Sequence, residues 1–384
     1  MNSGLACPHR PPCPGCPRFG AEGIAPGAHR ALESLAHAHG LPAVTVESGQ
    51  SAGFRLRARL AIRGRVGSPK LGLYELGTHR VVHIPTCSVQ HPLINQVAAV
   101  VRRALAETRV TCYSDKAHLG LARHLQVTVE RRSQSAQVVI AANCPTPEPL
   151  AACFALVCER LGSRLHSLWF NANEERSNTI LGSTFQNWCG QESIVDSFGG
   201  PSVHYPPGAF VQNNPEIAEH IIAHVRAQVP KGARVAEFYA GVGAIGLSLL
   251  AQVREIQMNE ISPHALRGLE MGIAGLGEAD KARITVVPGA AGGAFSMASN
   301  VDVVIADPPR KGLDPELTQQ LAENPPARFI YVSCALESLQ SDTVRLVSQG
   351  RLRLAALSAF NLLPFTEHVE TIACTTPLSD GPEP

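Results

Sequence analysis

The chain has 384 residues, of which 45% are hydrophobic, so it can bury more than one core. No apolar run is long enough to span a membrane, and the N-terminus lacks the apolar core of a signal peptide. These features exclude membrane and secreted proteins, and we expect a cytoplasmic location. The net charge of +1 hides an asymmetry, because residues 1–140 hold 17 Lys and Arg against 7 Asp and Glu. This basic first part indicates a polyanionic partner.

The first twenty residues contain three closely spaced cysteines. Cys7, Cys13 and Cys16 follow the spacing Cys-x5-Cys-x2-Cys, and Cys87 in "IPTCSVQHP" is the best candidate for a fourth ligand. Eleven cysteines in a reducing compartment favour metal ligation or catalysis over disulfides. Four thiolates bind zinc as readily as an iron–sulfur cluster, so the spacing alone leaves both metals open.

A helix is predicted near residues 26–39, followed by strands near 54–65 and 71–84. In "FRLRARLAIRGR", strict alternation puts five arginines on one strand face and apolar residues on the other. The five are Arg55, Arg57, Arg59, Arg63 and Arg65. No acidic residue lies between them, and guanidinium groups bind phosphate in a bidentate manner. We therefore predict that this face contacts nucleic acid.

Helical periodicity predicts helices over 92–107, 148–162 and 215–228. Strands are predicted over 123–132, 137–142 and 164–171, and the stretches "NTILGS" and "ESIVDSF" resemble a hairpin. From residue 234 the pattern changes to alternating strands and helices, which is typical of a doubly wound parallel sheet. The last segment, "RLRLAALSAFNLLPFTEHVETIACTT", predicts two strands without a helix between them, hence an antiparallel edge.

The first turn of the alternating region carries Gly241 and Gly243, which allow a ligand close to the backbone. Glu260 follows Gly241 by 19 residues, at the end of the next strand, where a carboxylate can accept ribose hydroxyls. Dinucleotide binding would be the usual interpretation. However, the fourth strand ends in "DPPRKG" from Asp307, and an Asp-Pro-Pro turn there is typical of S-adenosylmethionine (SAM) methyltransferases.

The residue after the two prolines bears on which atom is methylated. Amino-group methyltransferases usually place an aromatic residue there, whereas this chain has Arg310, so a carbon target is favoured. Pyrimidine carbon 5 becomes nucleophilic when a thiolate adds at carbon 6, and a base must later remove the carbon 5 proton. Cys334 in "YVSC" and Glu370 in "HVET" are the candidate nucleophile and base.

The motifs "FVQNNP", "FYAGVGAIG", "DPPRKGL", "YVSC" and "HVET" occur in this order, and the chain resembles the RNA uridine-5-methyltransferases from about Cys7 to Thr375. The resemblance implies that Cys334 is the nucleophile and Glu370 the base. It also places Gln212, Tyr239, Glu260 and Asp307 at SAM-binding positions. Two positions depart from the family pattern, Ala244 after the glycine turn and Gly272 after Glu260.

The resemblance further implies a four-iron four-sulfur (4Fe–4S) cluster held by Cys7, Cys13, Cys16 and Cys87. Methyl transfer needs no electron, so we expect a cluster that is structural or that shapes the RNA site. The compact chain resembles enzymes of 23S ribosomal RNA more than those of transfer RNA. No membrane or obligate protein partner is expected.

We therefore predict an α/β protein in three parts. Residues 1–90 form the N-terminal iron–sulfur and basic RNA-contacting region, and 91–205 form a central α+β domain. Residues 206–384 form a class I SAM-dependent methyltransferase domain, doubly wound with an antiparallel edge.

Two alternatives stay open. One is a non-catalytic iron–sulfur RNA-binding protein whose methyltransferase domain is inactive, which Ala244 and Gly272 support slightly. The other is a cytosine-5 enzyme, which is disfavoured because such enzymes usually have Cys at the position of Arg310.

Overall fold

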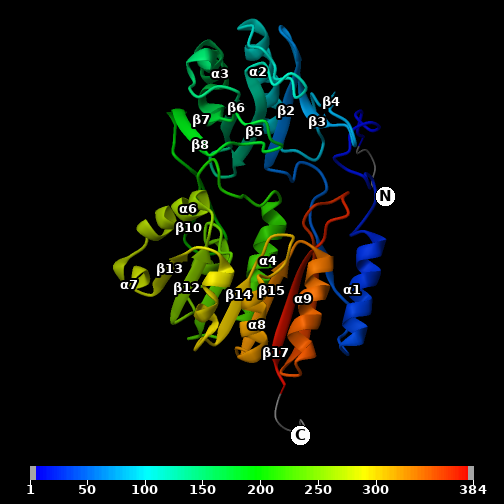
Figure 1. Ribbon diagram of the computed structural model, residues 1–384, viewed down its shortest axis with the longest axis vertical. Coiled ribbons are helices and arrows are strands. Elements are labelled where there is room, and N and C mark those ends of the chain that lie inside the picture. The colour runs from blue at the N-terminus through cyan, green and yellow to red at the C-terminus, as the bar shows by residue number, and fades with distance from the viewer. Residues whose placement is uncertain (1–5, 379–384) are drawn as a thin grey trace. The chain divides into compact units, whose positions relative to one another are not determined.

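The computed structural model describes residues 6–378, and they form two compact units (Figure 1). The first unit contains the chain up to Gly20, Gln50–Asp196 and Tyr205–Pro215. The second contains Ala21–Gly49, Ser197–His204 and the chain from Glu216. Among these described residues, no helix has the length and apolar character needed to cross a membrane.

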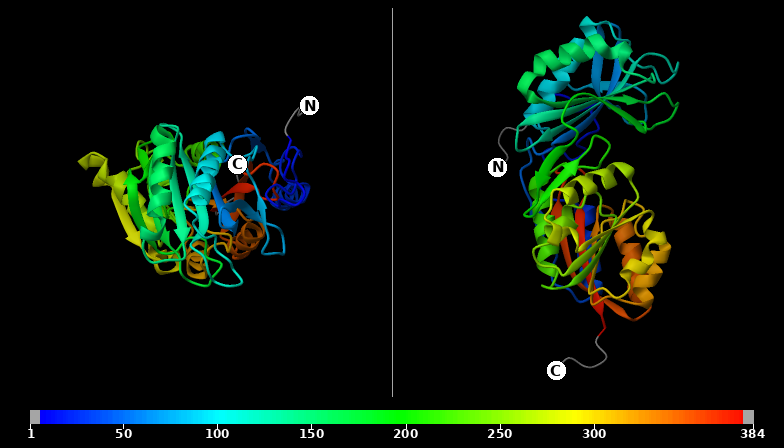
Figure 2. Two further views of the ribbon diagram at one scale, coloured as in Figure 1. Left: turned by 90° about the horizontal axis from the view of Figure 1, so that it is seen from above. Right: turned by 90° about the vertical axis from the view of Figure 1, so that its left-hand side faces the viewer.

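The first unit is built on a seven-stranded sheet of order β4-β3-β2-β5-β6-β7-β8, in which only β6 and β7 are parallel neighbours. Its strands are β2 (Arg57–Arg65), β3 (Ser68–Tyr74), β4 (Val81–His83), β5 (Ala122–Glu130), β6 (Ser135–Ala142), β7 (Leu165–Ala172) and β8 (Thr184–Gly190). Helices α2 (Pro92–Glu107) and α3 (Ala151–Leu161) cover one side of the sheet (Figure 2).

Strand β2 shows why the helices lie on that side. Ala58, Leu60 and Ile62 alternate along the strand, and all three pack in one core with apolar residues of α2 and α3. Because successive side chains of a strand point to opposite faces, the arginines between them lie on the face away from the helices. The alternation predicted from the sequence is therefore confirmed.

The predicted strand at "NTILGS", residues 178–183, is wrong, and the strand lies instead at β8. Asn173 donates from its side-chain amide to the carbonyls of Thr179 (2.8 Å) and Ile180 (3.1 Å). Asn171 likewise donates to Gly182 O at 3.0 Å. These carbonyls are satisfied by side chains from β7 and the residue after it, so the segment needs no strand partner to satisfy them.

The second unit has an eight-stranded mixed sheet of order β1-β16-β17-β15-β14-β11-β12-β13. Its strands are β1 (Val46–Ser48), β11 (Arg234–Phe238), β12 (Glu255–Glu260), β13 (Ile284–Pro288), β14 (Val303–Ala306), β15 (Arg328–Ser333), β16 (Leu352–Asn361) and β17 (Glu370–Pro377). Its helices are α1 (Pro26–Ala38), α4 (Pro215–Gln228), α5 (Ala244–Ser248), α6 (Pro263–Ala274), α7 (Glu278–Lys281), α8 (Pro315–Glu323) and α9 (Leu336–Ser348). Strands β9 (Ile194–Ser197) and β10 (Ser202–Tyr205) form a separate two-stranded sheet.

Helices cover both faces of the second sheet. Residues of α1, α8 and α9 share a core with β11, β14, β15 and β16, including Ala359 of β16. The next residue, Phe360, points to the opposite face and meets the ring of His224 from α4, with ring centroids 5.7 Å apart. This arrangement is the predicted doubly wound sheet.

The antiparallel pair β16 and β17 is present, but it does not form the edge of the sheet. Val46–Ser48 adds a further parallel strand beside β16. The two compact units also have other boundaries than the three predicted segments. Residues 21–49 belong to the second unit, and the predicted boundary between residues 90 and 91 falls inside the first unit. The position of β1 depends on a pairing more than 300 residues away in sequence, which no local pattern reveals.

Candidate active site

The parallel register of the second sheet brings three sequence motifs to one edge. Phe238 of β11 pairs with Ala306 of β14, which pairs with Tyr331 of β15. Asp307 therefore lies just beyond the end of β14, and Cys334 just beyond the end of β15. Strand β17 runs antiparallel to β15 and pairs Thr371 with Ser333, so Glu370 begins its strand at this same edge.

Cys334, Glu370 and Asp307 lie within electrostatic range of one another. The pKa of the Cys334 thiol is raised to about 11, mainly by burial and also by Glu370 and Asp307, while Arg310 opposes this rise. Burial also raises the pKa of Glu370 well above its ordinary value, with a further contribution from Asp307. The pKa of Asp307 is raised to about 7 by burial of its carboxyl. With no ligand bound, the thiol and Glu370 are therefore held in their protonated forms.

Arg310 supplies positive charge to this group. Its Nη2 atom lies 3.0 Å from Nε2 of His368, two residues before Glu370. Because a guanidinium can only donate, this contact requires an unprotonated imidazole nitrogen as the acceptor. The pair was not predicted from the sequence, since the two residues are 58 positions apart.

The glycine turn after β11 is organised by Glu260. Gly241 has φ 60° and Gly243 has φ 82°, a region that favours glycine. Glu260 Oε2 accepts from Gly241 N at 2.7 Å, and Oε1 accepts from the N–H groups of Ile261 (2.8 Å) and Ser262 (2.6 Å). A carboxylate has about four acceptor positions, so about one remains after these three bonds.

Gly246, in helix α5 after the glycine turn, has a packing role. A Cβ added to Gly246 would lie 2.2 Å from Glu237 Oε2 and 2.6 Å from Met258 Sδ. Glycine at this position thus permits close contact between helix and strand. Gly272 is similar, because a Cβ there would lie 3.0 Å from Leu247 Cδ1.

Tyr239 holds the loop that follows the Asp-Pro-Pro turn. Its φ is 59°, and its hydroxyl accepts a hydrogen bond from Asp314 N at 3.0 Å. Asp342, which the sequence reasoning missed, accepts from Leu313 N (3.0 Å) and from the Tyr331 hydroxyl (2.8 Å). A buried Asp on an amphipathic helix was the only sequence signal for this second anchor. Gln212, the remaining predicted SAM contact, lies in the first unit.

The four N-terminal cysteine candidates gather in the first unit. The pKa of Cys16 is raised to about 11, mainly by burial and also by the other three thiols, while Arg55 opposes this rise. Cys13 is affected by Cys7 and Cys87 in the same way. Among residues 6–378, however, no group of three or more His, Cys, Asp and Glu side chains is arranged as a metal site. The four thiols are near one another but do not point at one common centre. Four cysteine thiolates are nevertheless a suitable set of ligands for a metal.

The five predicted RNA-binding arginines differ in exposure. Arg59 and Arg65 are exposed, although Arg59 Nε donates to Gln126 at 2.7 Å. Arg57 is buried beside the Phe210 ring, and Arg55 is partly buried near the thiols of Cys16 and Cys87.

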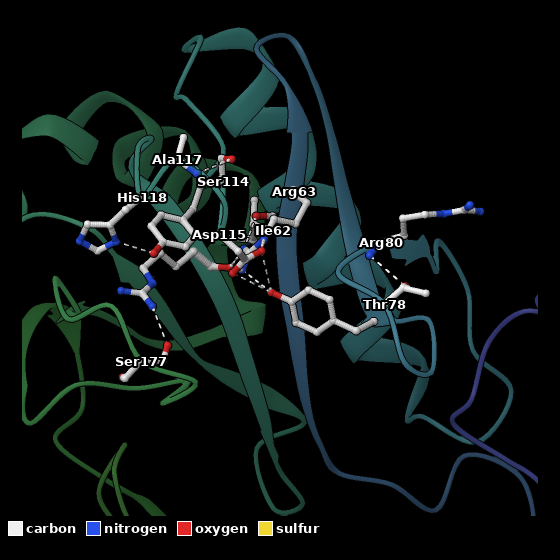
Figure 3. A network of polar contacts seen from close by, with 12 residues as sticks. Ile62, Arg63, Thr78, Arg80, Ser114, Asp115, Ala117, His118 and Ser177 are labelled. Atoms are coloured by element: carbon white, nitrogen blue, oxygen red, sulfur yellow. Dashed lines mark hydrogen bonds and ion pairs between the residues drawn. The ribbon is translucent and has the colours of Figure 1, made fainter.

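Arg63 is buried in a network of polar contacts (Figure 3). It donates from Nε and Nη2 to the two carboxylate oxygens of Asp115, both at 2.7 Å. Its Nη1 atom donates to the carbonyls of Ile62 and Arg123. Burial of Arg57 and Arg63 leaves fewer free guanidinium groups on this face than the sequence pattern suggested.

Comparisons with known proteins identify the family of this chain. Residues 296–375, which contain the Asp-Pro-Pro turn, Cys334 and Glu370, match the family model described as tRNA (uracil-5-)-methyltransferase. An RNA methyltransferase of Protochlamydia amoebophila is 32% identical over 96% of both chains. The chain belongs to the RNA (uracil-5-)-methyltransferase family. It is therefore a SAM-dependent RNA (uracil-5-)-methyltransferase.

A second relative and one solved structure are also similar to this chain. An RNA methyltransferase of Halalkalibacterium halodurans is 27% identical over 89% of this chain and 73% of its own. The fold is similar to that of the Pyrococcus abyssi tRNA (uracil-54, C5)-methyltransferase bound to S-adenosyl-L-homocysteine, with a TM-score of 0.75 and 21% identity. That likeness covers 95% of this chain and 86% of the archaeal one.

Proposed function

We propose that this protein transfers a methyl group from SAM to carbon 5 of a uridine in structured RNA, with Cys334 as nucleophile and Glu370 as base. The observation that carries the proposal is that Cys334, Glu370 and Asp307 share one sheet edge and influence one another's protonation. A buried site of this kind requires the target base to leave its stack.

In the proposed reaction, the Cys334 thiolate forms a bond to carbon 6 of the uracil ring and makes carbon 5 nucleophilic. SAM supplies an electrophilic methyl group when bound. After carbon 5 is methylated, the Glu370 carboxylate takes the carbon 5 proton, the bond from sulfur to carbon 6 breaks, and the ring double bond is restored. Arg310 favours the thiolate form at the start and end of this sequence.

We assign SAM binding to Gly241, Gly243, Glu260, Asp307 and Tyr239, all of the second unit. The glycine turn allows SAM to lie close to the protein backbone, and Glu260 keeps one acceptor position for a ribose hydroxyl. Tyr239 acts here by positioning the loop after the Asp-Pro-Pro turn, because its hydroxyl is already bonded to Asp314 N.

Trapping with RNA that contains 5-fluorouridine tests the proposal. Fluorine at carbon 5 cannot leave as a cation, so the methylated adduct should persist as a stable covalent complex with SAM present. Cys334→Ala should abolish the complex, whereas Cys112→Ala, a matched control in the first unit, should leave it intact. A complex that persists in Cys334→Ala would refute the assignment of Cys334 as the nucleophile. If the wild-type protein forms no complex and does not bind SAM, the non-catalytic alternative is supported.

The target RNA is part of the proposal. The sequence favours 23S ribosomal RNA, whereas the matching family model and the archaeal structure are named for transfer RNA. Mapping 5-methyluridine in total RNA from a strain that lacks the gene should show one missing site in ribosomal RNA. A missing site in transfer RNA alone would overturn the ribosomal assignment and leave the chemistry intact.

We also propose a 4Fe–4S cluster held by Cys7, Cys13, Cys16 and Cys87. Support comes from the mutual electrostatic influence of these thiols and from Arg55, whose positive charge lies near Cys16 and Cys87. A cluster carried by four thiolates is anionic, and such a cation would stabilise it. The cluster would brace the N-terminal segment against the residues around Cys87, and no reaction step uses it.

Anaerobic reconstitution tests the cluster. We expect four iron and four sulfide per chain with wild-type protein and a loss of both in Cys87→Ser. Cys144→Ser, a buried cysteine apart from the four, is the matched control. One zinc per chain without sulfide would show that the site is a zinc site instead.

A further inference from the structure

The outer side of the two helices of the first unit forms a groove of about 600 Å³. It is lined by Gln96, Ala99, Val100, Arg103 and Glu107 from α2, by Arg160 near the end of α3, and by Arg164 three residues beyond that helix. The α2 residues repeat every three or four positions, so they form one stripe along the helix surface. Other residues of α2, such as Ile94, Val97 and Val101, are fully buried in the core against the sheet.

Three arginines line this groove. For two of them, hydrogen bonds within the protein use only some of the N–H groups of the guanidinium. Arg160 donates to both carboxylate oxygens of Glu107, one at 2.9 Å. Arg164 donates to Gln96 Oε1 at 3.2 Å and to Arg160 O at 3.0 Å. A guanidinium has five N–H groups, so donors of both side chains remain available.

Arg103 is the third guanidinium and is exposed. The pKa of Glu107 is lowered by its hydrogen bond to Arg160 and also by the charge of Arg103, so the carboxylate stays ionised and is matched by two cations. Arg164 adds a third positive charge, and the other lining residues are neutral. Glu159 on α3 is the one other acid that acts on Arg160.

We propose that this groove binds the phosphate backbone of RNA and forms a second RNA contact of the first unit. The inference rests on the proposed function, in which the substrate is structured RNA. Guanidinium forks match phosphate geometry, and phosphate contacts position a protein on RNA without reading its sequence. The groove lies on the helix side of the sheet, whereas the β2 arginines point to the opposite side, so the two contacts hold different segments of a folded RNA.

Salt dependence of RNA binding measures the contact directly. The logarithm of the binding constant falls linearly with the logarithm of salt, with a slope of about −0.7 to −0.9 per neutralised phosphate. Binding of a 23S ribosomal RNA transcript and of unfractionated transfer RNA is measured without SAM. Arg103→Ala should reduce the slope by about one phosphate contact and weaken binding about three- to fivefold at low salt. Arg353→Ala, an exposed arginine of β16, should change neither.

Gln96→Glu separates RNA binding from helix stability. The new carboxylate would strengthen the contact with Arg164, so a purely structural groove predicts an equal or higher melting temperature and unchanged RNA affinity. An RNA-binding groove predicts weaker binding at the same melting temperature or above. Arg103→Lys retains the charge and should recover most of the wild-type slope.

The outcomes distinguish this inference from the proposed function. Unchanged slopes for Arg103→Ala and Gln96→Glu with both RNAs would overturn the groove, even if wild-type protein methylates RNA. Reduced slopes together with no methyl transfer by wild-type protein would leave the groove standing and refute the proposed reaction. Binding of acidic peptides with no effect on RNA would identify a protein partner and also overturn the inference.

Discussion

At the scale of single residues, burial raises the pKa of a thiol and two carboxyls in the proposed active site, so that Cys334 and Glu370 are protonated at neutral pH and Asp307 is about half protonated. Protonation lowers the free-energy cost of burying three acidic groups near one another, because neutral groups lose less hydration free energy than charged groups. Arg310 opposes the effect on Cys334. The catalytic forms of Cys334 and Glu370 are thus the less populated ones in the ligand-free protein at neutral pH.

The pH dependence of methyl transfer follows from these pKa directions. The proposed reaction needs the Cys334 thiolate and the Glu370 carboxylate, and both pKa values are raised. The reactive fraction of each group therefore increases with pH, so the single-turnover rate should rise from pH 6 to pH 9, up to tenfold per unit while one group limits. Arg310→Gln should shift the profile to higher pH, because it removes the charge that lowers the Cys334 pKa. A rate that falls over this range would contradict the assignment.

Two arginines of the same strand should respond differently to substitution. Arg63→Ala would leave Asp115 without its bidentate partner in a partly buried network, so we expect a loss of about 3 kcal/mol of unfolding free energy. Arg65→Ala, at the exposed end of β2, should leave thermal stability unchanged and weaken RNA binding. Chemical denaturation and RNA titration of both variants would check this. Equal melting temperatures for the two variants would contradict it.

At the scale of elements, the loop from Asp307 to α8 is fixed from two sides. Tyr239 bonds to Asp314 N, and Asp342 of α9 bonds to Leu313 N. Tyr239, which follows β11, and Asp342 of α9 thereby hold the segment that follows Arg310. Rigid support of this kind keeps reacting groups correctly oriented, and correct orientation contributes much of the rate increase in enzymes.

Gly312 is the position where this loop tolerates no side chain. Its φ is 86°, and an added Cβ would lie 2.4 Å from Asp342 Oδ2. Gly312→Ala should cost at least about 1–2 kcal/mol from the backbone conformation alone and should lower the methyl-transfer rate. Gly350→Ala, with φ 72° and open space around the added Cβ, is the matched control, since it has only the backbone cost. Equal stabilities for the two variants would show that the contact with Asp342 does not matter.

At the scale of the whole molecule, the basic and acidic residues are unevenly distributed along the chain. The first 140 residues carry the basic excess, and the SAM-binding candidates of the second unit lie in the acidic remainder. RNA affinity should fall steeply between 50 and 200 mM salt, while SAM affinity should change little, because SAM binding releases few counterions. Calorimetry with SAM and RNA titrations at matched salt would test this. A SAM affinity that falls as steeply as RNA affinity would contradict the division.

The sequence by itself determined the local elements and the order of the chemical motifs. Helix 92–107 was predicted with its true bounds, because apolar periodicity and the flanking residues act within a few turns. The glycine turn, Asp307 and Cys334 follow the ends of parallel strands, and Glu370 begins an antiparallel strand, so the sheet brings all four to one edge. Their catalytic and cofactor-binding roles stay predictions.

Tertiary structure alone decided the partners of side chains. Arg63 and Arg65 look equivalent along β2, yet only Arg63 meets Asp115, 52 residues away. Strand β1 pairs with β16 across most of the chain, and the groove between α2 and α3 joins Arg103 to residues more than fifty positions later. Periodicity assigns a residue to a face, but burial and pairing on that face depend on which distant segments the fold places there.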